Sequence, residues 1–426
     1  MSSVMDQGAS RLIEAATRAF AEGRARDAER YLQQAQTLAP RHPMVLNEAA
    51  RRKLFENDPA GAYALLQEAI KTETQHSDLW MTLAAASNAL GKPDEELAAL
   101  EQVLALEPRN LRALLQVAVF HETHDDKRAA AASYRTALSS IPRGVDLHPE
   151  MLAHIQHGRE VVEANNLALE TFLQERLEGV RREHPDQPTK RFDRCMDTLL
   201  QKQRIFRQQP TFMYFPQLPS IEFYERSDFP WLDGIEAAAD DIRAEFLDVF
   251  TEDKMALEPY VQGMPHDAWK ALNNSRRWSV YYLWKAGKAV SENMARCPKT
   301  MAALEAWPKC DLPGSGPSAV FSLLDAKSRI PPHTGVNNTR LIVHLPLIVP
   351  EGCGFRVGGE TREWEPGKAF VFDDTIEHEA WNDSDVPRAV MIFDIWNPLV
   401  TLAEREMVKA LTAGVADFYG ELPSYV

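Results

Sequence analysis

A 34-residue spacing runs through residues 1–145 and constrains the fold more than any other feature of the chain. Turn-forming residues recur at this interval, at Gly23, Asn57, Gly91 and Asp125. Small apolar residues recur in two further registers, which are Ala16, Ala50, Ala84 and Ala118, and Ala35, Ala69, Val103 and Ala137. Small side chains let two helices approach closely, and the turn positions tolerate a left-handed backbone. Each unit is therefore predicted to be a helix, a turn and a second helix.

Prolines near the ends of the units support this phase. Pro40, Pro108 and Pro142 follow the second helices, and Thr74 stands where the second unit lacks its proline. A helix–turn–helix repeat of this length resembles the tetratricopeptide family. The resemblance implies an all-α solenoid over residues 1–145, and stacked repeats form a concave groove. Two roles stay open for it, a scaffold for the neighbouring domain or a groove that holds a peptide or another protein.

The composition is typical of a soluble globular protein with more than one domain. The chain has 426 residues, too many for one ordinary core, and 45% of them are hydrophobic. Acidic residues outnumber basic ones by 62 to 47, and the net charge of −15 argues against nucleic acid or an anionic membrane surface as the main partner. No run of about eighteen apolar residues, the length that spans a membrane, occurs in the sequence.

The cysteines and the N-terminus together favour a cytoplasmic protein. Cys195, Cys297, Cys310 and Cys353 are scattered and include no CxxC pair, so neither structural zinc nor a disulfide framework is expected. The first residues lack the basic and then apolar regions of a signal peptide.

Residues 146–210 are predicted to be a helical connector, because long charged runs are interrupted only by a loop near residue 185. Two histidine pairs at helical spacing, His121 with His124 and His154 with His157, lie in or before it. A third metal ligand is not evident for either pair, so solvated helix faces are the better interpretation.

From about Tyr214 the pattern changes toward β structure, with one helix expected over Gly234 to Phe250. After Ser318, short apolar runs separated by turn residues predict strands. These runs are Ala319–Leu324, Leu341–Val349, Gly354–Val357, Ala369–Phe372 and Ala389–Trp396. Many short strands at this spacing are typical of an antiparallel jelly roll. Residues 211–426 are therefore predicted to form an α+β domain built on such a barrel.

Two histidines and an arginine stand among these strands. His333 lies in Pro-Pro-His-Thr-Gly, His378 follows Phe-Asp-Asp-Thr-Ile-Glu, and Arg388 comes ten residues later. Neutral imidazole suits ferrous iron, whose common non-haem site has two histidines, one carboxylate and open positions. A planar guanidinium pairs bidentately with a carboxylate. The pattern therefore indicates a mononuclear iron site that uses an α-keto acid.

The third ligand of such a site is missing from its usual position. It normally lies two residues after the first histidine, where this chain has Gly335. Asp374 is a candidate to compensate through a bridging water, and Ser322 and His344 are candidates to bond the co-substrate carboxylate. Spacing alone leaves an alternative open, in which the histidines are buried and bonded to backbone groups and the arginine lies at the surface after a loop.

The motifs around these residues resemble the aspartyl/asparaginyl β-hydroxylase family. They occur in order, with little gap, from about residue 214 to residue 398. They are Phe229-Pro230-Trp231, Arg296-Cys297-Pro298-Lys299-Thr300, Pro332-His333-Thr334-Gly335, Arg340, His344-Leu345, Gly352-Cys353, Glu360-Thr361-Arg362, Trp364, Phe372-Asp373-Asp374, Glu377-His378-Glu379, Trp381 and Arg388. Animal enzymes of this family also carry tetratricopeptide repeats ahead of the oxygenase domain, which is the order expected here.

The resemblance implies a 2-oxoglutarate- and Fe(II)-dependent dioxygenase of double-stranded β-helix fold that consumes O2. By position, it assigns the iron to His333 and His378. It assigns the distal carboxylate of 2-oxoglutarate to Arg388, assisted by Ser322 and His344.

Two positions bear on which residue roles of the family can be assigned to this chain. Gly335, in place of the usual carboxylate, is a trait of the family. Ile342 departs from it, because the animal members have an arginine two residues before the equivalent of His344, and Arg340 is a candidate substitute. Trp278 is a candidate wall of the site or a core residue.

We expect this chemistry to hydroxylate an unactivated C–H bond, the β-carbon of an Asp, Asn or similar residue in a peptide or protein recruited by the repeats. One alternative is the same reaction on a small molecule, a natural-product precursor or a lipid-linked acyl group. The other is a non-enzymatic repeat scaffold with an inert barrel.

Overall fold

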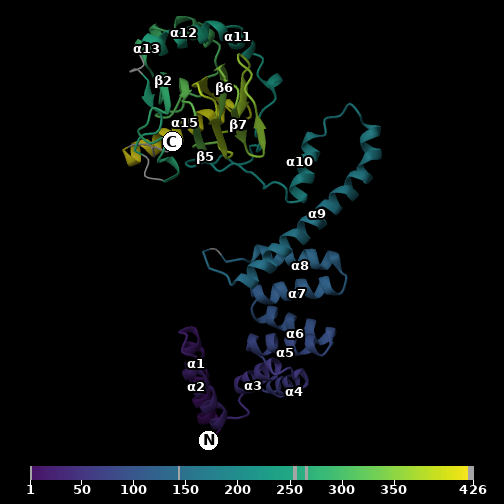
Figure 1. Ribbon diagram of the computed structural model, residues 1–426. Helices are drawn as coiled ribbons and strands as arrows, with labels where there is room; N and C mark the ends of the chain where they lie inside the picture. The colour runs from purple at the N-terminus through teal and green to yellow at the C-terminus, as the bar shows by residue number, and fades with distance from the viewer. Residues whose placement is uncertain (1, 143, 253–256, 264–266, 421–426) are drawn as a thin grey trace. The chain divides into compact units, whose positions relative to one another are not determined.

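The computed structural model describes residues 2–142, 144–252, 257–263 and 267–420 and divides the chain into two compact units (Figure 1). The first comprises Met1–Thr189 and the second Lys190–Val426. This boundary falls inside the segment predicted as a connector, residues 146–210, so that segment is shared between the two units. None of the described helices is both long and apolar enough to cross a membrane.

The first unit is built from helices that pair in sequence order. They are α1 (Ser2–Ala21), α2 (Ala25–Leu38), α3 (Pro43–Phe55), α4 (Pro59–Ala69), α5 (Ser77–Ala89), α6 (Pro93–Leu106), α7 (Leu111–Thr123), α8 (Lys127–Ser139) and α9 (Pro149–Glu183). Each of the first four pairs is joined by a residue of the predicted turn register. Gly23, Asn57, Gly91 and Asp125 all have left-handed backbones, with φ of +73°, +62°, +65° and +58°. The predicted helix–turn–helix repeat is therefore present.

The small residues of the repeat lie where the paired helices meet. Those of the first register are 0–2% exposed and those of the second are 0% exposed; they are Ala16, Ala50, Ala84 and Ala118, and Ala35, Ala69, Val103 and Ala137. A larger side chain at these positions would hold the helices apart, so the sequence spacing follows from close helix packing.

Helix α9 packs its first turns against α8 and covers the last repeat. Gly158 makes this possible, because a Cβ atom there would lie 2.6 Å from the ring of Tyr134. The Tyr134 hydroxyl donates to the Glu122 carboxylate at 2.8 Å, and His157 Nε2 lies 2.9 Å from the same carboxylate. His154 is bonded instead to the Glu150 carbonyl. The two histidines of this helix are thus hydrogen-bonded to a carboxylate and to a backbone carbonyl of their own helix.

The second unit is rich in β structure and contains two antiparallel sheets. The larger has the order β1-β2-β4-β11-β6-β9, with β3 paired to β2, and the smaller has the order β5-β10-β7-β8. The strands of the larger sheet are β1 (Glu258–Pro259), β2 (Trp278–Lys285), β3 (Lys288–Ala289), β4 (Ala319–Leu324), β6 (Arg340–Ile348), β9 (Phe370–Phe372) and β11 (Arg388–Trp396). Those of the smaller are β5 (Ser328–His333), β7 (Cys353–Val357), β8 (Glu360–Arg362) and β10 (His378–Asn382).

Side chains alternate between the two faces of the larger sheet, and this alternation positions the site. Phe321, Leu341 and Met391 belong to a core that includes residues of α12 (Ala239–Glu252). The intervening residues face the smaller sheet, where Val390 packs in a second core with Phe355. The remaining helices of this unit are α10 (Lys190–Leu199), α11 (Leu232–Ala237), α13 (Ser291–Ala295), α14 (Pro298–Ala303) and α15 (Leu402–Tyr419).

The predicted strands are present with ends shifted by one residue or less, but one helix prediction is wrong and several strands were missed. The single helix expected over Gly234 to Phe250 is two helices, because α11 ends at Ala237 and α12 begins at Ala239. Strands β1, β2, β3 and β8 were not predicted, and neither were the two that carry the histidines, β5 and β10. Strand β5 contains two prolines and β10 reads His-Glu-Ala-Trp-Asn, so neither of these two presents the apolar run on which strand prediction depends.

Candidate active site

His333 and His378 lie directly opposite each other in the smaller sheet. They end β5 and begin β10, and they are register partners in the antiparallel pair that these strands form. Their ring centroids are 4.1 Å apart. Two segments 45 positions apart in the sequence thus bring two imidazoles into contact.

The two rings are oriented in the same way by backbone carbonyls. His333 Nδ1 lies 2.8 Å from the Pro331 carbonyl oxygen, and His378 Nδ1 lies 3.1 Å from that of Ile376. A carbonyl oxygen only accepts, so Nδ1 carries the proton in each ring and Nε2 keeps its lone pair. Burial lowers the pKa of His333 to about 3 and that of His378 to about 4. Both imidazoles are therefore neutral near pH 7, the form that coordinates a metal.

Asp374 provides a carboxylate at the place where the sequence lacks one. A Cβ atom built on Gly335 would lie 2.2 Å from Asp374 Oδ2 and 2.5 Å from Oδ1. Gly335 also donates its backbone N–H to the Asp374 carbonyl at 2.6 Å. Asp374 is 6% exposed, and its Oδ1 atom has no hydrogen-bond partner in the described structure. Within that same part of the chain, no group of three or more His, Cys, Asp or Glu side chains is arranged to hold a metal ion.

Arg388 is a buried cation with no carboxylate beside it. Its side chain is 1% exposed, and no carboxylate among the described residues acts on its charge. The guanidinium lies over the Trp364 ring at 4.5 Å, and its Nε atom has no partner. Burial lowers the pKa of this arginine to about 10, so it stays charged at neutral pH. The alternative that placed Arg388 at the surface is therefore wrong.

Ser322 and His344 lie on the two strands that flank β11. In the register of the sheet, Ser322 faces Val390 and His344 faces Ile392, so both lie on the same side as Arg388. His344 is buried against two phenylalanine rings, and its Nδ1 atom has no partner. Burial and the nearby arginine hold its pKa well below the usual value, so the ring is neutral.

Trp278 serves as both a wall and a hydrogen-bond donor. Its indole Nε1 donates to Ser322 Oγ at 3.1 Å, which leaves the serine hydroxyl proton for another acceptor. The ring stacks on Tyr260 with centroids 4.2 Å apart and is 5% exposed. Trp278 is therefore both a wall of the site and a residue of the core, as the two interpretations of the sequence allowed.

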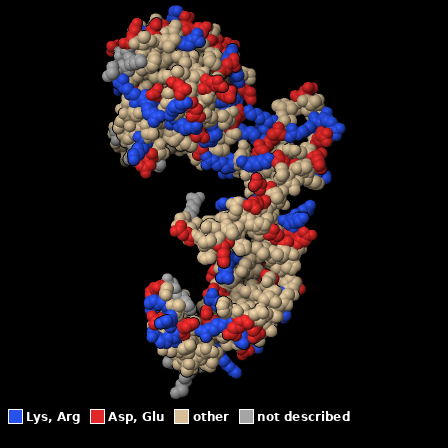
Figure 2. Space-filling model, in the orientation of Figure 1, with Lys and Arg blue, Asp and Glu red and all other residues tan. Residues whose placement is uncertain are grey.

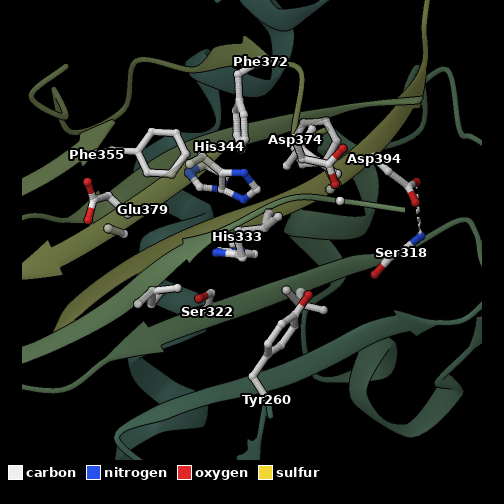
Figure 3. A pocket seen from close by; sticks show the side chains of 18 of the residues that line it. Tyr260, Ser318, Ser322, His333, His344, Phe355, Phe372, Asp374, Glu379 and Asp394 are labelled. Carbon is white, nitrogen blue, oxygen red and sulfur yellow. Dashed lines mark hydrogen bonds between the residues drawn. The ribbon is translucent and has the colours of Figure 1, made fainter. Parts of the chain in front are cut away.

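One cavity of about 120 Å³ lies between these side chains. Its lining includes both histidines, Gly335, Asp374, Ser322, His344, Arg388 and Trp278. A single water needs only about 10–15 Å³ on this measure, so a small organic acid has room. Figure 3 shows His333 in the middle, with Phe355 to the left, Asp374 and Asp394 to the right, and Ser322 and Tyr260 below.

Comparison with known proteins identifies the region that carries the cavity. Residues 236–398 match the family model described as aspartyl/asparaginyl beta-hydroxylase. The chain is 36% identical over 149 residues to human aspartyl/asparaginyl beta-hydroxylase, which is 35% of this chain and 19% of that protein. It is 34% identical over 188 residues to an ornithine lipid ester-linked acyl 2-hydroxylase of Rhizobium tropici, which is 43% of this chain and 64% of that protein. The resemblance to the aspartyl/asparaginyl β-hydroxylases is confirmed.

The matched relatives extend well beyond what they share with this chain. It spans about a fifth of the human protein and less than two thirds of the rhizobial one. Among solved structures, the Cut9–Hcn1 hetero-tetramer of the APC/C is 19% identical and covers 34% of this chain and 29% of its own, with a TM-score of 0.30. The tetratricopeptide-like character of the first unit follows from its helix pairs and left-handed turns.

The β-hydroxylase-like region departs from the animal enzymes at one edge of the cavity. Ile342 lines the cavity where those enzymes have an arginine. Arg340, two residues earlier on the same face of β6, is bonded to Asp374 at 3.1 Å and lies 3.8 Å from Asp394. The candidate substitute is thus engaged by two carboxylates.

Asp394 is a lining residue that the sequence analysis missed. It is 1% exposed and accepts the Ser318 backbone N–H with both carboxylate oxygens at 3.2 Å. Burial raises its pKa to about 7. The signal was available, because Asp394 lies six residues after Arg388 on one strand and therefore on the same face.

Proposed function

We propose that this protein is a 2-oxoglutarate- and Fe(II)-dependent dioxygenase that hydroxylates an unactivated C–H bond. The observation that carries the proposal is the shared cavity of Arg388 and the two neutral histidines. Leaving a buried charge uncompensated costs about 3–5 kcal/mol. A buried guanidinium without a carboxylate partner is therefore best explained by an anionic ligand that binds next to the imidazoles.

His333 and His378 fit the requirements of an iron site. Both present a neutral imidazole with the proton fixed on Nδ1, an arrangement that orients Nε2 toward a metal. Asp374 would act through a bridging water, because its unpartnered Oδ1 atom is buried in the same cavity. Iron bound there would activate O2 with electrons from 2-oxoglutarate, which is oxidised to succinate and CO2 as the substrate gains a hydroxyl group.

The distal carboxylate of 2-oxoglutarate would lie on Arg388. The guanidinium offers planar, bidentate donors, and its stacking on Trp364 fixes their plane. Ser322 has a hydroxyl proton to donate once Trp278 has bonded its oxygen. His344 contributes a neutral ring with an unpartnered Nδ1. Together these residues would hold a dianion in a site that excludes water.

The strand order supports a double-stranded β-helix, the jelly roll expected from the sequence. The two antiparallel sheets face each other across the second core, and the cavity residues come from strands of both. Phe355 and Phe372 close the cavity from the smaller and larger sheet respectively. Their rings would keep water from the reacting centre.

We propose the β-carbon of an Asp, Asn or similar residue in a peptide or protein as the site of hydroxylation, with the repeats recruiting that partner. Stacked helical repeats present a concave surface suited to polypeptides. The rhizobial relative favours a second candidate, the same reaction on a lipid-linked acyl group or another small molecule.

Two measurements test these proposals. The full chain with Fe(II) and O2 should convert 2-oxoglutarate to succinate, and His378→Ala should abolish that conversion when substrate is present. Undiminished turnover in the variant would remove the proposal. A chain that binds neither iron nor 2-oxoglutarate would instead support the inert-scaffold alternative.

Removal of the repeats distinguishes a polypeptide substrate from a small-molecule substrate. A chain that begins at Lys190 should lose turnover of a polypeptide substrate while it still binds 2-oxoglutarate, which checks that the second unit is folded. Unchanged turnover by the shortened chain would favour a small molecule.

A further inference from the structure

The two ends of the cavity differ in charge. At one end Arg388 has no carboxylate beside it among the described residues. At the other end, Asp374 and Asp394 share the single guanidinium of Arg340, with N–O distances of 3.1 Å and 3.8 Å. One end therefore carries an unbalanced cation, whereas the other has two carboxylates for one cation.

Asp394 is held rigidly with its carboxylate toward the cavity. It lies on β11, and Figure 3 shows it bonded to Ser318 and on the same side of His333 as Asp374. Both carboxylate oxygens accept the Ser318 N–H, which orients the group without neutralising it. Burial keeps water from this carboxylate and raises its pKa to about 7, so the group is ionised above that pH.

Unused hydrogen-bonding capacity remains at this end. Asp374 Oδ1 and Arg340 Nε are both buried without a hydrogen-bond partner. Asp374 is more than nine-tenths buried, and it lines the cavity. Acceptor atoms in this position are costly unless a donor reaches them. A carboxamide would satisfy both atoms, because its N–H can donate to Asp374 Oδ1 and its carbonyl oxygen can accept from Arg340 Nε, whereas an ammonium group would satisfy the carboxylate alone.

Further cations are lacking among the described residues that line this end. Ile342 places an apolar side chain between Arg340 and His344 on β6. Glu379 also lines the cavity, but Arg356 neutralises it at 2.5 Å. A carboxylate that entered beside Asp394 would meet two like charges and compete with both for one guanidinium, which is unfavourable in a buried site.

We propose that the Arg340 end binds a substrate group that donates hydrogen bonds and carries no negative charge, a carboxamide or an ammonium group, and that it discriminates against a carboxylate. This inference rests on the proposed function and narrows its substrate class. Asparagine-like or cationic side chains are favoured over aspartate, and Asp394 and Ile342 are the residues that set this preference.

A matched series of three probes tests the preference. N-acetyl amides of asparagine, aspartate and 2,4-diaminobutyrate have side chains of the same length that end in an amide, a carboxylate and an ammonium group. Calorimetric titration into the full chain at pH 8, where Asp394 is ionised, should show the amide and ammonium probes binding at least about tenfold more tightly than the carboxylate. Equal or tighter binding of the aspartate probe, or no binding of any probe, would overturn the inference.

Two substitutions should shift the preference in a defined direction. Asp394→Asn keeps an acceptor for Ser318 but removes one charge, and it should reduce the discrimination by about tenfold. Ile342→Arg adds a cation at the same end and should strengthen binding of the aspartate probe. Asp385→Asn, on an exposed residue paired with Lys327, should leave all three affinities as they are. Unchanged ratios in both cavity variants would contradict the assignment.

The titrations separate this inference from the proposed function. Binding of 2-oxoglutarate is measured in the same samples, and it depends on Arg388 at the other end of the cavity. Absence of 2-oxoglutarate binding by the unmodified chain counts against the dioxygenase. A different order of the three probe affinities counts against the charge preference alone. If Asp394→Asn does not fold, the order in the unmodified chain and the response of Ile342→Arg still decide.

Discussion

The carboxylate of Asp374 fills the space that a side chain at Gly335 would occupy. A Cβ atom at position 335 would fall 2.2 Å from Asp374 Oδ2, closer than any unbonded contact allows. The glycine and the aspartate are therefore complementary, and a third ligand cannot be introduced at position 335 without moving the existing carboxylate.

The substitution Gly335→Asp should consequently destabilise the protein. Overpacking of a buried site costs about 1–3 kcal/mol, and two carboxylates would also be forced together. Adding Asp374→Gly should recover most of the lost free energy of unfolding, because it vacates the space. Urea denaturation without metal measures both effects. The two positions do not compete for space if Gly335→Asp alone is as stable as the unmodified chain. The same conclusion follows if the double variant is no more stable than Gly335→Asp.

Arg388 makes opposite contributions to stability and to ligand binding. Replacing it by methionine, in Arg388→Met, removes a buried and unpaired charge, so the free energy of unfolding without ligand should not fall. The same variant should lose the stabilisation that 2-oxoglutarate provides, about 2.7 kcal/mol at a hundred times its Kd.

Thermal unfolding with and without 2-oxoglutarate measures this difference. Arg329→Met removes an exposed arginine that pairs with Asp383 and should keep the full response to the ligand. An Arg388→Met variant that is still stabilised by 2-oxoglutarate would refute the assignment of the distal carboxylate to this residue.

Residue patterns were sufficient to predict the helical repeats and four strands of the larger sheet, β4, β6, β9 and β11. Left-handed turns at Gly91 and its equivalents, and short apolar runs in β4, β6 and β11, are local patterns with direct structural consequences. The pairing of His333 with His378 was not predictable in this way, because it depends on the register of two strands that lack an apolar pattern.

The charge arrangement of the cavity was also beyond sequence reasoning. The six-residue spacing from Arg388 places Asp394 on the same face of the strand, but no motif around Asp394 indicates which cation it contacts. Its contact with Arg340 joins β11 to β6, and its role becomes visible only when both strands are placed. Arg388 was recognised as a ligand-binding residue, but the absence of a carboxylate partner among the described residues required the packed structure.

Asp394 should make the stability of the protein depend on pH. Its pKa is raised by burial to about 7 in the folded state, against an ordinary value of 3.8. The folded state therefore binds the proton more tightly than the unfolded one. The resulting stabilisation is fully present below about pH 4 and is lost as the pH rises through 7.

The comparison of Asp394→Asn with the unmodified chain isolates this contribution. Between pH 4 and 7, the free energy of unfolding of the unmodified chain should decline relative to that of the variant by on the order of 1 kcal/mol per pH unit. Carboxyl groups away from the cluster of Asp374, Asp394 and Arg340 contribute equally to both proteins and cancel. Parallel pH profiles would mean that the folded state does not hold this proton.

The left-handed turns of the repeats can be tested by a Gly→Ala substitution at a turn and, as a control, the same substitution within a helix. Gly91 has φ of +65°, and a Cβ atom there would touch nothing within 4 Å, so Gly91→Ala should destabilise through the backbone alone, by about 1–2 kcal/mol. Gly179 lies within helix α9 and also has open space around it. Gly179→Ala should therefore stabilise by up to about 1 kcal/mol. Chemical denaturation followed by circular dichroism at 222 nm, a wavelength that reports helix loss, measures the change in the free energy of unfolding of each variant. A change of the same sign in the two variants would contradict the turn geometry on which the repeat depends.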